Sequence, residues 1–176
     1  MQTLHCLLGL CCVAVLATAG SGPATSLNST DKTFLVAAAK TDMIEAHESQ
    51  IAEGQAKRAD VKDFAKTLVQ ESGDSYEHLT ELAAKTGASI PKGIDAARVA
   101  AIQRLNHVKG DRFDQEFIKS EIAADRQAIA LFKHEAADGY DADVKAYVAK
   151  TIPVLEKDLQ LAGGVRQATE AQLIQQ

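Results

Sequence analysis

Cysteine is absent from this chain after residue 12, because all three cysteines, Cys6, Cys11 and Cys12, lie within the first dozen residues. The rest of the chain can therefore enter an oxidising compartment without forming disulfides. Tryptophan is absent altogether, and aromatic residues make up only 5% of the sequence. Combined with the many alanines, this shortage of large rings favours closely packed helices over a β-sandwich.

The chain also lacks any run of basic residues. Its formal net charge is -5, and its lysines and arginines are scattered. A nucleic-acid-binding surface needs a basic patch that can follow phosphates, so no nucleic-acid partner is expected. Hydrophobic content of 46% and charged content of 24% are ordinary for a soluble globular protein, and 176 residues suit a single domain with a sizeable core.

Residues 1–19 are predicted to be a signal peptide. Leu4–Leu16 forms a short apolar region, and the A-x-A pattern of residues 17–19 marks a cleavage site after Ala19. The apolar region is too short to anchor the mature chain in a bilayer. We expect an exported, periplasmic protein. The alternative is an outer-membrane-associated lipoprotein anchored through Cys11 or Cys12, although Leu10 is larger than the residue such sites favour.

Residues 60–87 predict the helix around which the rest of the chain is organised. Apolar residues recur there at steps of three and four, which places them on one helix face. Asp60 is a suitable N-cap for this helix, and Gly87 is a suitable residue to end it. The apolar face consists of Val61, Phe64, Ala65, Leu68, Val69, Leu79, Leu82 and Ala83.

Similar patterns predict further helices over residues 31–57, 111–137 and 141–162, together with a short helix that begins after Asp95. The four long helices should pack as a bundle over residues 31–163, and the short one should cross its outside. Pro153 should kink the last helix. Residues 20–30 are predicted to be a flexible lead-in, and residues 164–176, which follow Gly163-Gly164, a frayed tail.

Each long helix carries a polar interruption near its middle. Glu45 lies on the first helix, Glu71 and Ser72 on the second, Asp125 between Ile122 and Ile129 on the helix at 111–137, and Asp158 on the last. In an antiparallel bundle these positions could meet at one level, as do the residues of known bundle-core sites.

Four segments together resemble a bacterial family of exported ferritin-like proteins, domain of unknown function 4142, often labelled a predicted outer membrane protein. They are FLVAAAKTDMIEAHESQIA, VKDFAKTLVQES, FDQEFIKSEIAADRQAIALF and AKTIPVLEKDLQLA. The resemblance spans roughly residues 31–162 and implies an all-α, ferritin-like four-helix bundle with a short extra helix in the crossover connection. It implies no established activity.

The family's polar landmarks fall on the same interruptions. Its first-helix glutamate corresponds to Glu45, and its Asp-His pair corresponds to Glu71-Ser72. Its two later histidines correspond to Asp125 and Asp158. Relative to the family pattern, this chain therefore keeps the glutamate and replaces all three histidines by oxygen-bearing residues.

These replacements leave three interpretations open. No Glu-x-x-His motif occurs, which argues against an intact di-iron centre. A set made of Glu45, Asp125 and Asp158, with Glu71 as a fourth member, would suit a hard divalent cation. Alternatively, the site is retired and its acids are protonated or hydrated in the core, or helix rotation exposes some of them.

No catalytic residue is predicted. Ser72 and Ser75 have no histidine placed to activate them, so nucleophilic catalysis is unsupported. His47 should lie outside the bundle seam, and His134 should pair with Asp138 one turn later on an exposed face.

The sequence favours a non-enzymatic binding or stress-associated protein of the cell envelope, with no cofactor. One alternative is a metal-binding or metal-dependent oxidoreductase bundle that holds a divalent cation. Another is an interaction scaffold for an envelope protein, which would use Arg98, Arg104 and His107 on the short helix.

Overall fold

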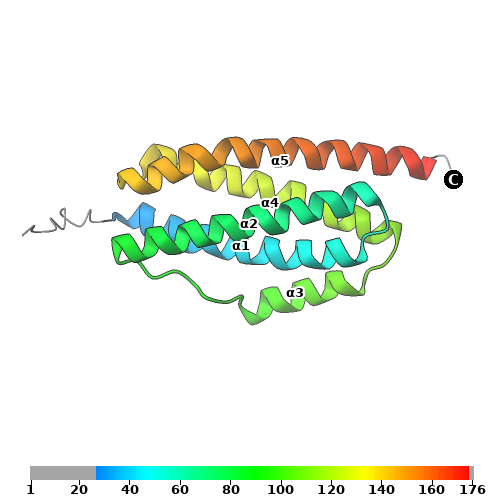
Figure 1. Cartoon of the computed structure of the whole chain (residues 1–176), viewed down its shortest axis with the longest axis horizontal. Helices are drawn as coiled ribbons and strands as arrows, with labels where there is room; N and C mark the ends of the chain where they lie inside the picture. Colours follow the sequence, from blue (N-terminus) through cyan, green and yellow to red (C-terminus); the bar gives the residue numbers. More distant parts are fainter. Residues whose placement is uncertain (1–26, 175–176) are drawn as a thin grey trace, which may run out of the picture.

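The computed structural model describes residues 27–174, and these fold into five helices with no strand among them. The four longest helices form a bundle, and the short α3 lies along its outside (Figure 1). The predicted all-α bundle is confirmed. The helices are α1 (Ser29–Gln55), α2 (Ala59–Thr86), α3 (Ala96–His107), α4 (Asp111–Asp138) and α5 (Ala142–Ile174).

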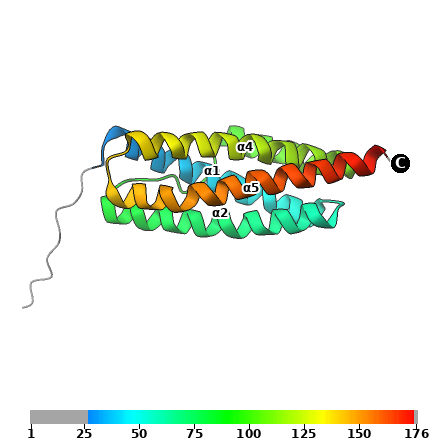
Figure 2. The same ribbon diagram turned by 90° about the horizontal axis from the view of Figure 1, so that it is seen from above.

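The chain reverses direction between α1 and α2 and again between α4 and α5, but not between α2 and α4 (Figure 2). The long connection from α2 to α4 runs back along the bundle and includes α3. As a result, α1 and α5 run one way while α2 and α4 run the other. α1 packs on α2 and α4, and α5 packs on α4 and, less extensively, on α2. One long crossover is the connectivity of ferritin-like bundles.

On each long helix, the residues that face the core are spaced alternately three and four apart, which is the pattern of coiled-coil packing. We call these residues the seam of the helix. The seam residues are buried or half-buried. They are Asp31, Leu35, Ala38, Asp42, Glu45, Ser49 and Ala52 in α1; Val61, Ala65, Leu68, Ser72, Ser75, Leu79 and Leu82 in α2; Asp114, Ile118, Glu121, Asp125, Ala128, Phe132 and Glu135 in α4; and Val144, Val148, Thr151, Leu155, Asp158 and Ala162 in α5, preceded by Asp141.

The polar residues in the middle of these seams divide the apolar core into two clusters. The cluster near the start of α1 includes Phe34 and Phe132, whose rings meet edge to face with centroids 4.8 Å apart. The cluster near the α1–α2 turn includes Phe113 and Phe117. Apolar burial at both ends holds the helices together, so the bundle tolerates an unfavourable polar layer between them.

The bundle end near the start of α1 is fastened by a buried carboxylate. Asp31 accepts hydrogen bonds from the backbone N–H groups of Asn28 (2.7 Å), Tyr140 (2.8 Å) and Asp141 (3.2 Å). Burial alone would raise the pKa of Asp31, but the neighbouring Glu135 carboxyl and these three donors lower it. Asp31 therefore ties α1 to the turn between α4 and α5.

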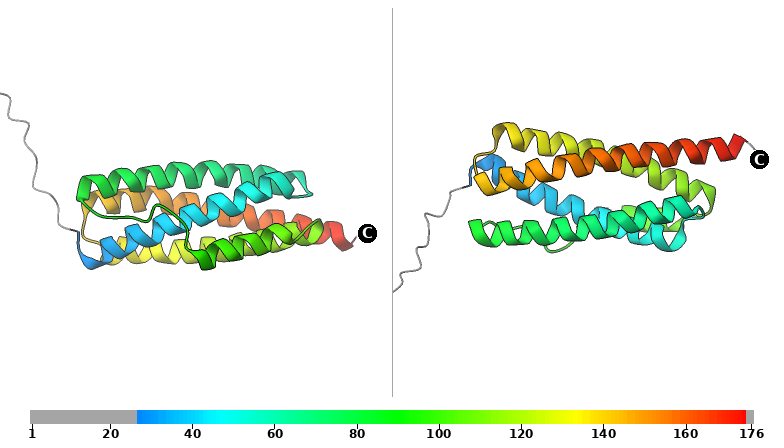
Figure 3. Two further views of the ribbon diagram at one scale, coloured as in Figure 1. Left: turned by 90° about the horizontal axis from the view of Figure 1, so that it is seen from below. Right: turned by 45° about the horizontal axis from the view of Figure 1, so that its top comes forward.

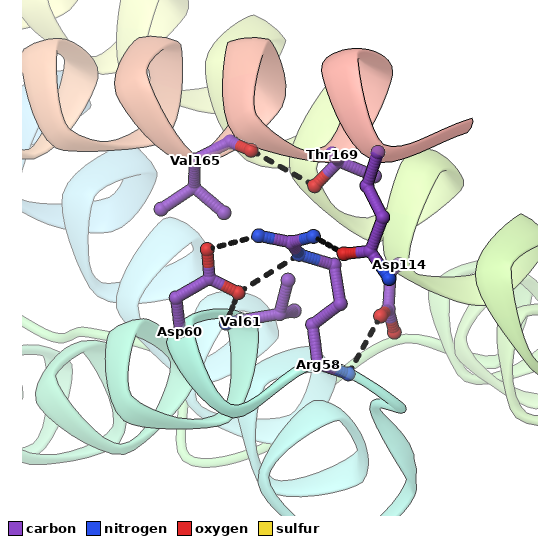
Figure 4. Close-up of polar contacts among 7 residues, drawn as sticks. Arg58, Asp60, Val61, Asp114, Val165 and Thr169 are labelled. Atoms are coloured by element: carbon purple, nitrogen blue, oxygen red, sulfur yellow. Dashed lines mark hydrogen bonds and ion pairs between the residues drawn. The ribbon is translucent and has the colours of Figure 1, made fainter. Parts of the chain in front are cut away.

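A second buried carboxylate fastens the opposite end. The two carboxylate oxygens of Asp114 in α4 accept hydrogen bonds from the backbone N–H groups of Lys57 and Arg58, each at 2.9 Å. The Arg58 guanidinium in turn binds Asp60 and reaches the Gln172 side chain of α5 (Figure 4). This end of the bundle joins the α1–α2 turn, α4 and the last turns of α5.

Two predicted helix starts need correction. Asp60 is not an N-cap, because α2 already begins at Ala59, and Asp60 lies in its first turn beside Arg58. The predicted flexible lead-in extends too far, because Leu27 is buried and α1 begins at Ser29. The side chain of Asn28 accepts a hydrogen bond from the backbone N–H of Asp31, and the side chain of Asp31 accepts one from the backbone N–H of Asn28. The two bonds together form a capping box.

The prediction that the last helix ends at Gly163-Gly164 is wrong. α5 continues to Ile174, with Thr169 buried. A glycine within a helix costs only about 1 kcal/mol relative to alanine, and the anchoring of Gln172 by Arg58 favours a continuous helix. Pro153 lies inside α5.

The split core leads to a test of the packing. Ile122 and Ile129 are buried in α4, and truncating either to alanine should lower the free energy of unfolding by about 2–4 kcal/mol through lost burial and cavity formation. Leu155, predicted to belong to the core, is only half-buried, so its truncation to alanine should lower the free energy of unfolding by less. Leu161, which is 43% exposed, is the control and should change stability by about 0.5 kcal/mol or less. Urea denaturation measures all four, and an unaffected Ile122→Ala variant would contradict this packing.

Over residues 27–174, no helix combines the length and the apolar character needed to cross a membrane. The predicted signal peptide at residues 1–19 and residues 20–26 of the lead-in lie outside the described residues.

Candidate functional site

The polar residues predicted from the sequence come together in the middle of the bundle. Glu45, Glu71, Ser72, Asp125 and Asp158 all line one small cavity of about 40 Å³, and the four long helices each contribute at least one of them. Ser72 and Asp125 are 2% exposed and Asp158 is 3% exposed, while Glu71 is half-buried. Helix rotation therefore does not bring Ser72, Asp125 or Asp158 to the surface, whereas the Glu71 side chain stays partly exposed.

Ser72 links α2 to α1 inside this cavity. Its Oγ lies 2.9 Å from Glu45 Oε2 and 2.6 Å from the carbonyl oxygen of Leu68. A hydroxyl has one proton and can donate to only one of these oxygens. Both contacts are therefore hydrogen bonds only when the Glu45 carboxyl is protonated and donates to Ser72.

The cavity approaches the surface between α2 and α5, where one cation partly neutralises it. Lys157 Nζ lies 3.4 Å from Glu71 Oε1 and 3.9 Å from Asp158 Oδ1. The Lys157 side chain is mostly exposed, so this contact is screened by water. A single exposed ammonium group does not compensate the carboxyl groups deeper in the bundle.

Sequence reasoning missed two further buried acids at this level. Asp42, in α1, lines the same cavity. Glu121, in α4, is 1% exposed and lies one turn from Asp125. Both occupy regular seam positions, so the three-and-four spacing could have identified them had polar residues been counted along with apolar ones. We call Asp42, Glu45, Glu71, Glu121, Asp125 and Asp158 the acidic core cluster.

Burial and mutual repulsion favour the protonated form of five of these acids, Asp42, Glu45, Glu121, Asp125 and Asp158. Burial is the main cause in each case. With the added charge of Glu45, it raises the pKa of Asp42 to about 8, and with the charges of Glu45, Asp158 and Glu71 it raises the pKa of Asp125 to about 8. The pKa of Glu45 and that of Asp158 rise to about 7, and the pKa of Glu121 is raised well above its ordinary value.

Several buried carboxyl oxygens in the acidic core cluster have no hydrogen-bond partner. They belong to Asp42, Glu71, Glu121, Asp125 and Asp158. An unpaired buried polar atom is costly, and an unpaired buried charge is more so. At neutral pH the cluster must therefore either retain protons or take up a compensating cation.

The arrangement does not fit a di-iron centre. His47 is exposed, with its ring nitrogen 2.8 Å from the carbonyl oxygen of Met43, so its predicted place outside the seam is confirmed. His134 pairs with Asp138 at 2.8 Å, as predicted, and His78 is exposed beside Tyr147. In residues 27–174, moreover, no three histidine, cysteine or acidic side chains are positioned to share a metal ion. The donor chemistry of the cluster is oxygen alone.

A four-helix bundle with one long crossover and inward-facing carboxyl groups defines a ferritin-like helical protein. The sequence model described as "Domain of unknown function (DUF4142)" matches residues 16–165, and the chain belongs to this family.

The fold has a solved counterpart. The crystal structure of a DUF305 fragment from Deinococcus radiodurans superposes with a TM-score of 0.72 over 81% of this chain and 99% of the fragment. At 9% sequence identity, this similarity establishes the fold alone. A comparison with curated proteins gave no match.

Proposed function

We propose that this protein is a non-enzymatic binding protein of the cell envelope whose acidic core cluster takes up a hard divalent cation. The observation that carries the proposal is the convergence of Glu45, Glu71, Asp125 and Asp158 from four helices around one small cavity. The predicted signal peptide at residues 1–19 supports the envelope location.

The donor set favours a cation such as Ca²⁺ or Mn²⁺ over copper or zinc. Carboxylate and hydroxyl oxygens suit hard ions, whereas copper and zinc sites are usually completed by histidine or cysteine. Glu45, Asp125 and Asp158 would be the principal ligands, and Glu71 would be added when Lys157 swings away. Binding would require these side chains to converge on one point, and Glu45, Asp125 and Asp158 to release their protons, since no three of the acids in the described residues are now placed to share an ion.

The proposal predicts that the cation stabilises the fold. At pH 7.5, Mn²⁺ or Ca²⁺ at a hundredfold excess over its dissociation constant should raise the free energy of unfolding by about 2.7 kcal/mol, because it binds only the folded chain. Urea denaturation with and without each ion measures this increase. Asp125→Asn should abolish most of it, because the amide cannot supply a charged ligand.

Glu135→Gln is the matched control. Glu135 is another buried acid of α4, and burial next to Asp31 raises its pKa to about 8, but it lies at the bundle end and outside the cavity. Glu135→Gln should keep the full cation effect. Equal stabilisation of the parent and of Asp125→Asn would contradict the proposed ligand set.

A further inference from the structure

A second pocket opens on the opposite side of the acidic core cluster. It lies between α1 and α4, at the point where the first turn of α3 meets the bundle, and has a volume of about 300 Å³. α3 lies along only part of the α1–α4 side (Figure 3). This pocket is far larger than a metal ion and falls at the lower end of small-molecule sites.

The pocket has an acidic floor and an apolar wall. Glu121 is 1% exposed, lines the pocket and has a buried carboxyl oxygen without a partner. Glu45 lines this pocket as well as the central cavity. Ile44 and Leu131 supply apolar surface beside these acids, together with several alanines.

A positively charged side chain of the protein already lies at the mouth of the pocket. Arg98 of α3 lines the pocket beside Glu48, and its charge lowers the pKa of Glu48, which burial raises. Arg98 is exposed and belongs to the first turn of a short outer helix, so its guanidinium can leave at little cost. Glu121, deeper in the pocket, has no such partner.

We propose that this pocket binds a short aliphatic diamine, with one ammonium group against Glu121 and Glu45 and the other against Glu48 in place of Arg98. Ile44 and Leu131, which line the same pocket as these acids, offer apolar surface to the alkyl chain. An ammonium group that displaces the proton of a buried carboxyl group forms a charged hydrogen bond, the strongest contact the pocket offers. Of the acids that line the site, only Glu45 also lines the central cavity; the two share Thr41, Ala124 and Ala128 besides.

Isothermal titration calorimetry with 1,4-diaminobutane at pH 7.5 tests this site. The parent protein should bind one diamine per chain. Glu121→Gln should weaken binding by at least about tenfold, because it removes the charged partner of the inner ammonium. Arg98→Ala should strengthen binding, because it frees Glu48. Butylamine, with one ammonium group, should bind more weakly than the diamine.

Asp158→Asn separates this inference from the proposed metal site. Asp158 lines the central cavity but not this pocket, so its variant should lose cation binding and keep diamine binding. Absence of heat with the parent, or equal affinity in the parent and Glu121→Gln, would overturn the inference. Circular dichroism confirms that each variant is folded.

Discussion

Asp42 and Asp125 alone are expected to lower the unfolding free energy of the cation-free protein by roughly 5 kcal/mol when the pH is raised from 5.5 to 7.5. The cause lies in the acidic core cluster. Asp42 and Asp125 have their pKa raised to about 8 by burial and by neighbouring carboxylates, so the folded protein keeps their protons throughout this interval. An unfolded carboxyl group has a pKa of about 4 and has already released its proton.

The sign follows from proton linkage. Where the folded state binds more protons than the unfolded state, stability falls as pH rises, by about 1.4 kcal/mol per pH unit for each proton. Two such protons across two pH units give the expected loss of roughly 5 kcal/mol. The loss begins above the unfolded pKa of about 4 and ends above the folded pKa of about 8. Asp31 has a lowered pKa, so it contributes only at more acidic pH.

Asp125→Asn is the informative variant. Asp125 faces Glu45 from α1, Glu71 from α2 and Asp158 from α5, with Glu121 on its own helix. Asp125→Asn should reduce the loss of unfolding free energy between pH 5.5 and pH 7.5 by about 2.7 kcal/mol, which is the contribution of one proton. Asp125→Leu should be more stable than the parent at pH 7.5 by about 1–3 kcal/mol, because it removes a buried, incompletely paired carboxyl group. Urea titrations in the presence of a chelator measure these effects, and an unchanged pH profile in Asp125→Asn would contradict the burial of a protonated acid there.

Asp114→Ala should lower the free energy of unfolding by about 3–5 kcal/mol. The fully buried Asp114 carboxylate accepts from the backbone N–H groups of Lys57 and Arg58, and each charge-assisted bond contributes about 1.5–3 kcal/mol. Without it, two donors of the α1–α2 turn lose their partner. That turn connects α1 and α2, the most extensively packed pair of helices.

Asp111→Ala provides the matched control, because it removes an acid from the same first turn of α4. Its partner is the exposed Lys57 ammonium at 2.8 Å, a surface ion pair expected to contribute less than about 1 kcal/mol. The loss of unfolding free energy, measured by thermal or urea denaturation, should be several times larger in Asp114→Ala than in Asp111→Ala. Similar small losses in both would show that Asp114 does not fasten the turn.

The arrangement of helices could be predicted from the sequence because apolar residues spaced by three and four mark the buried faces directly. The residues at which the helices begin and end could not be predicted in this way. Asp60 looks like an N-cap, yet the tertiary contact of Asp114 with the backbone of Arg58 fixes that turn. Likewise Gly163-Gly164 looks like a helix end, but Val165 packs on the apolar core and Thr169 is buried beyond it. In both cases a contact between distant segments outweighs a local preference.

The candidate site could be predicted in part for a similar reason. Asp125 stands between two isoleucines of the apolar stripe, and this position predicts its burial. Asp42 and Glu121 follow the same spacing, but a pattern defined by apolar residues alone does not include acidic seam positions, so it does not predict them. Four of the seven α4 seam residues are acids, and the assembled bundle shows that all four are buried. The pairing of Ser72 with Glu45 likewise depends on how α1 and α2 pack.

Equilibrium dialysis against Mn²⁺ at pH 7.5, followed by elemental analysis, tests the acidic core cluster as a cation site most directly. The parent protein should retain one Mn²⁺ per chain. The double variant Asp125→Asn, Asp158→Asn should retain almost none, while Glu135→Gln should match the parent. A parent chain that retains no ion, or a double variant that retains as much as the parent, would contradict cation binding at this cluster.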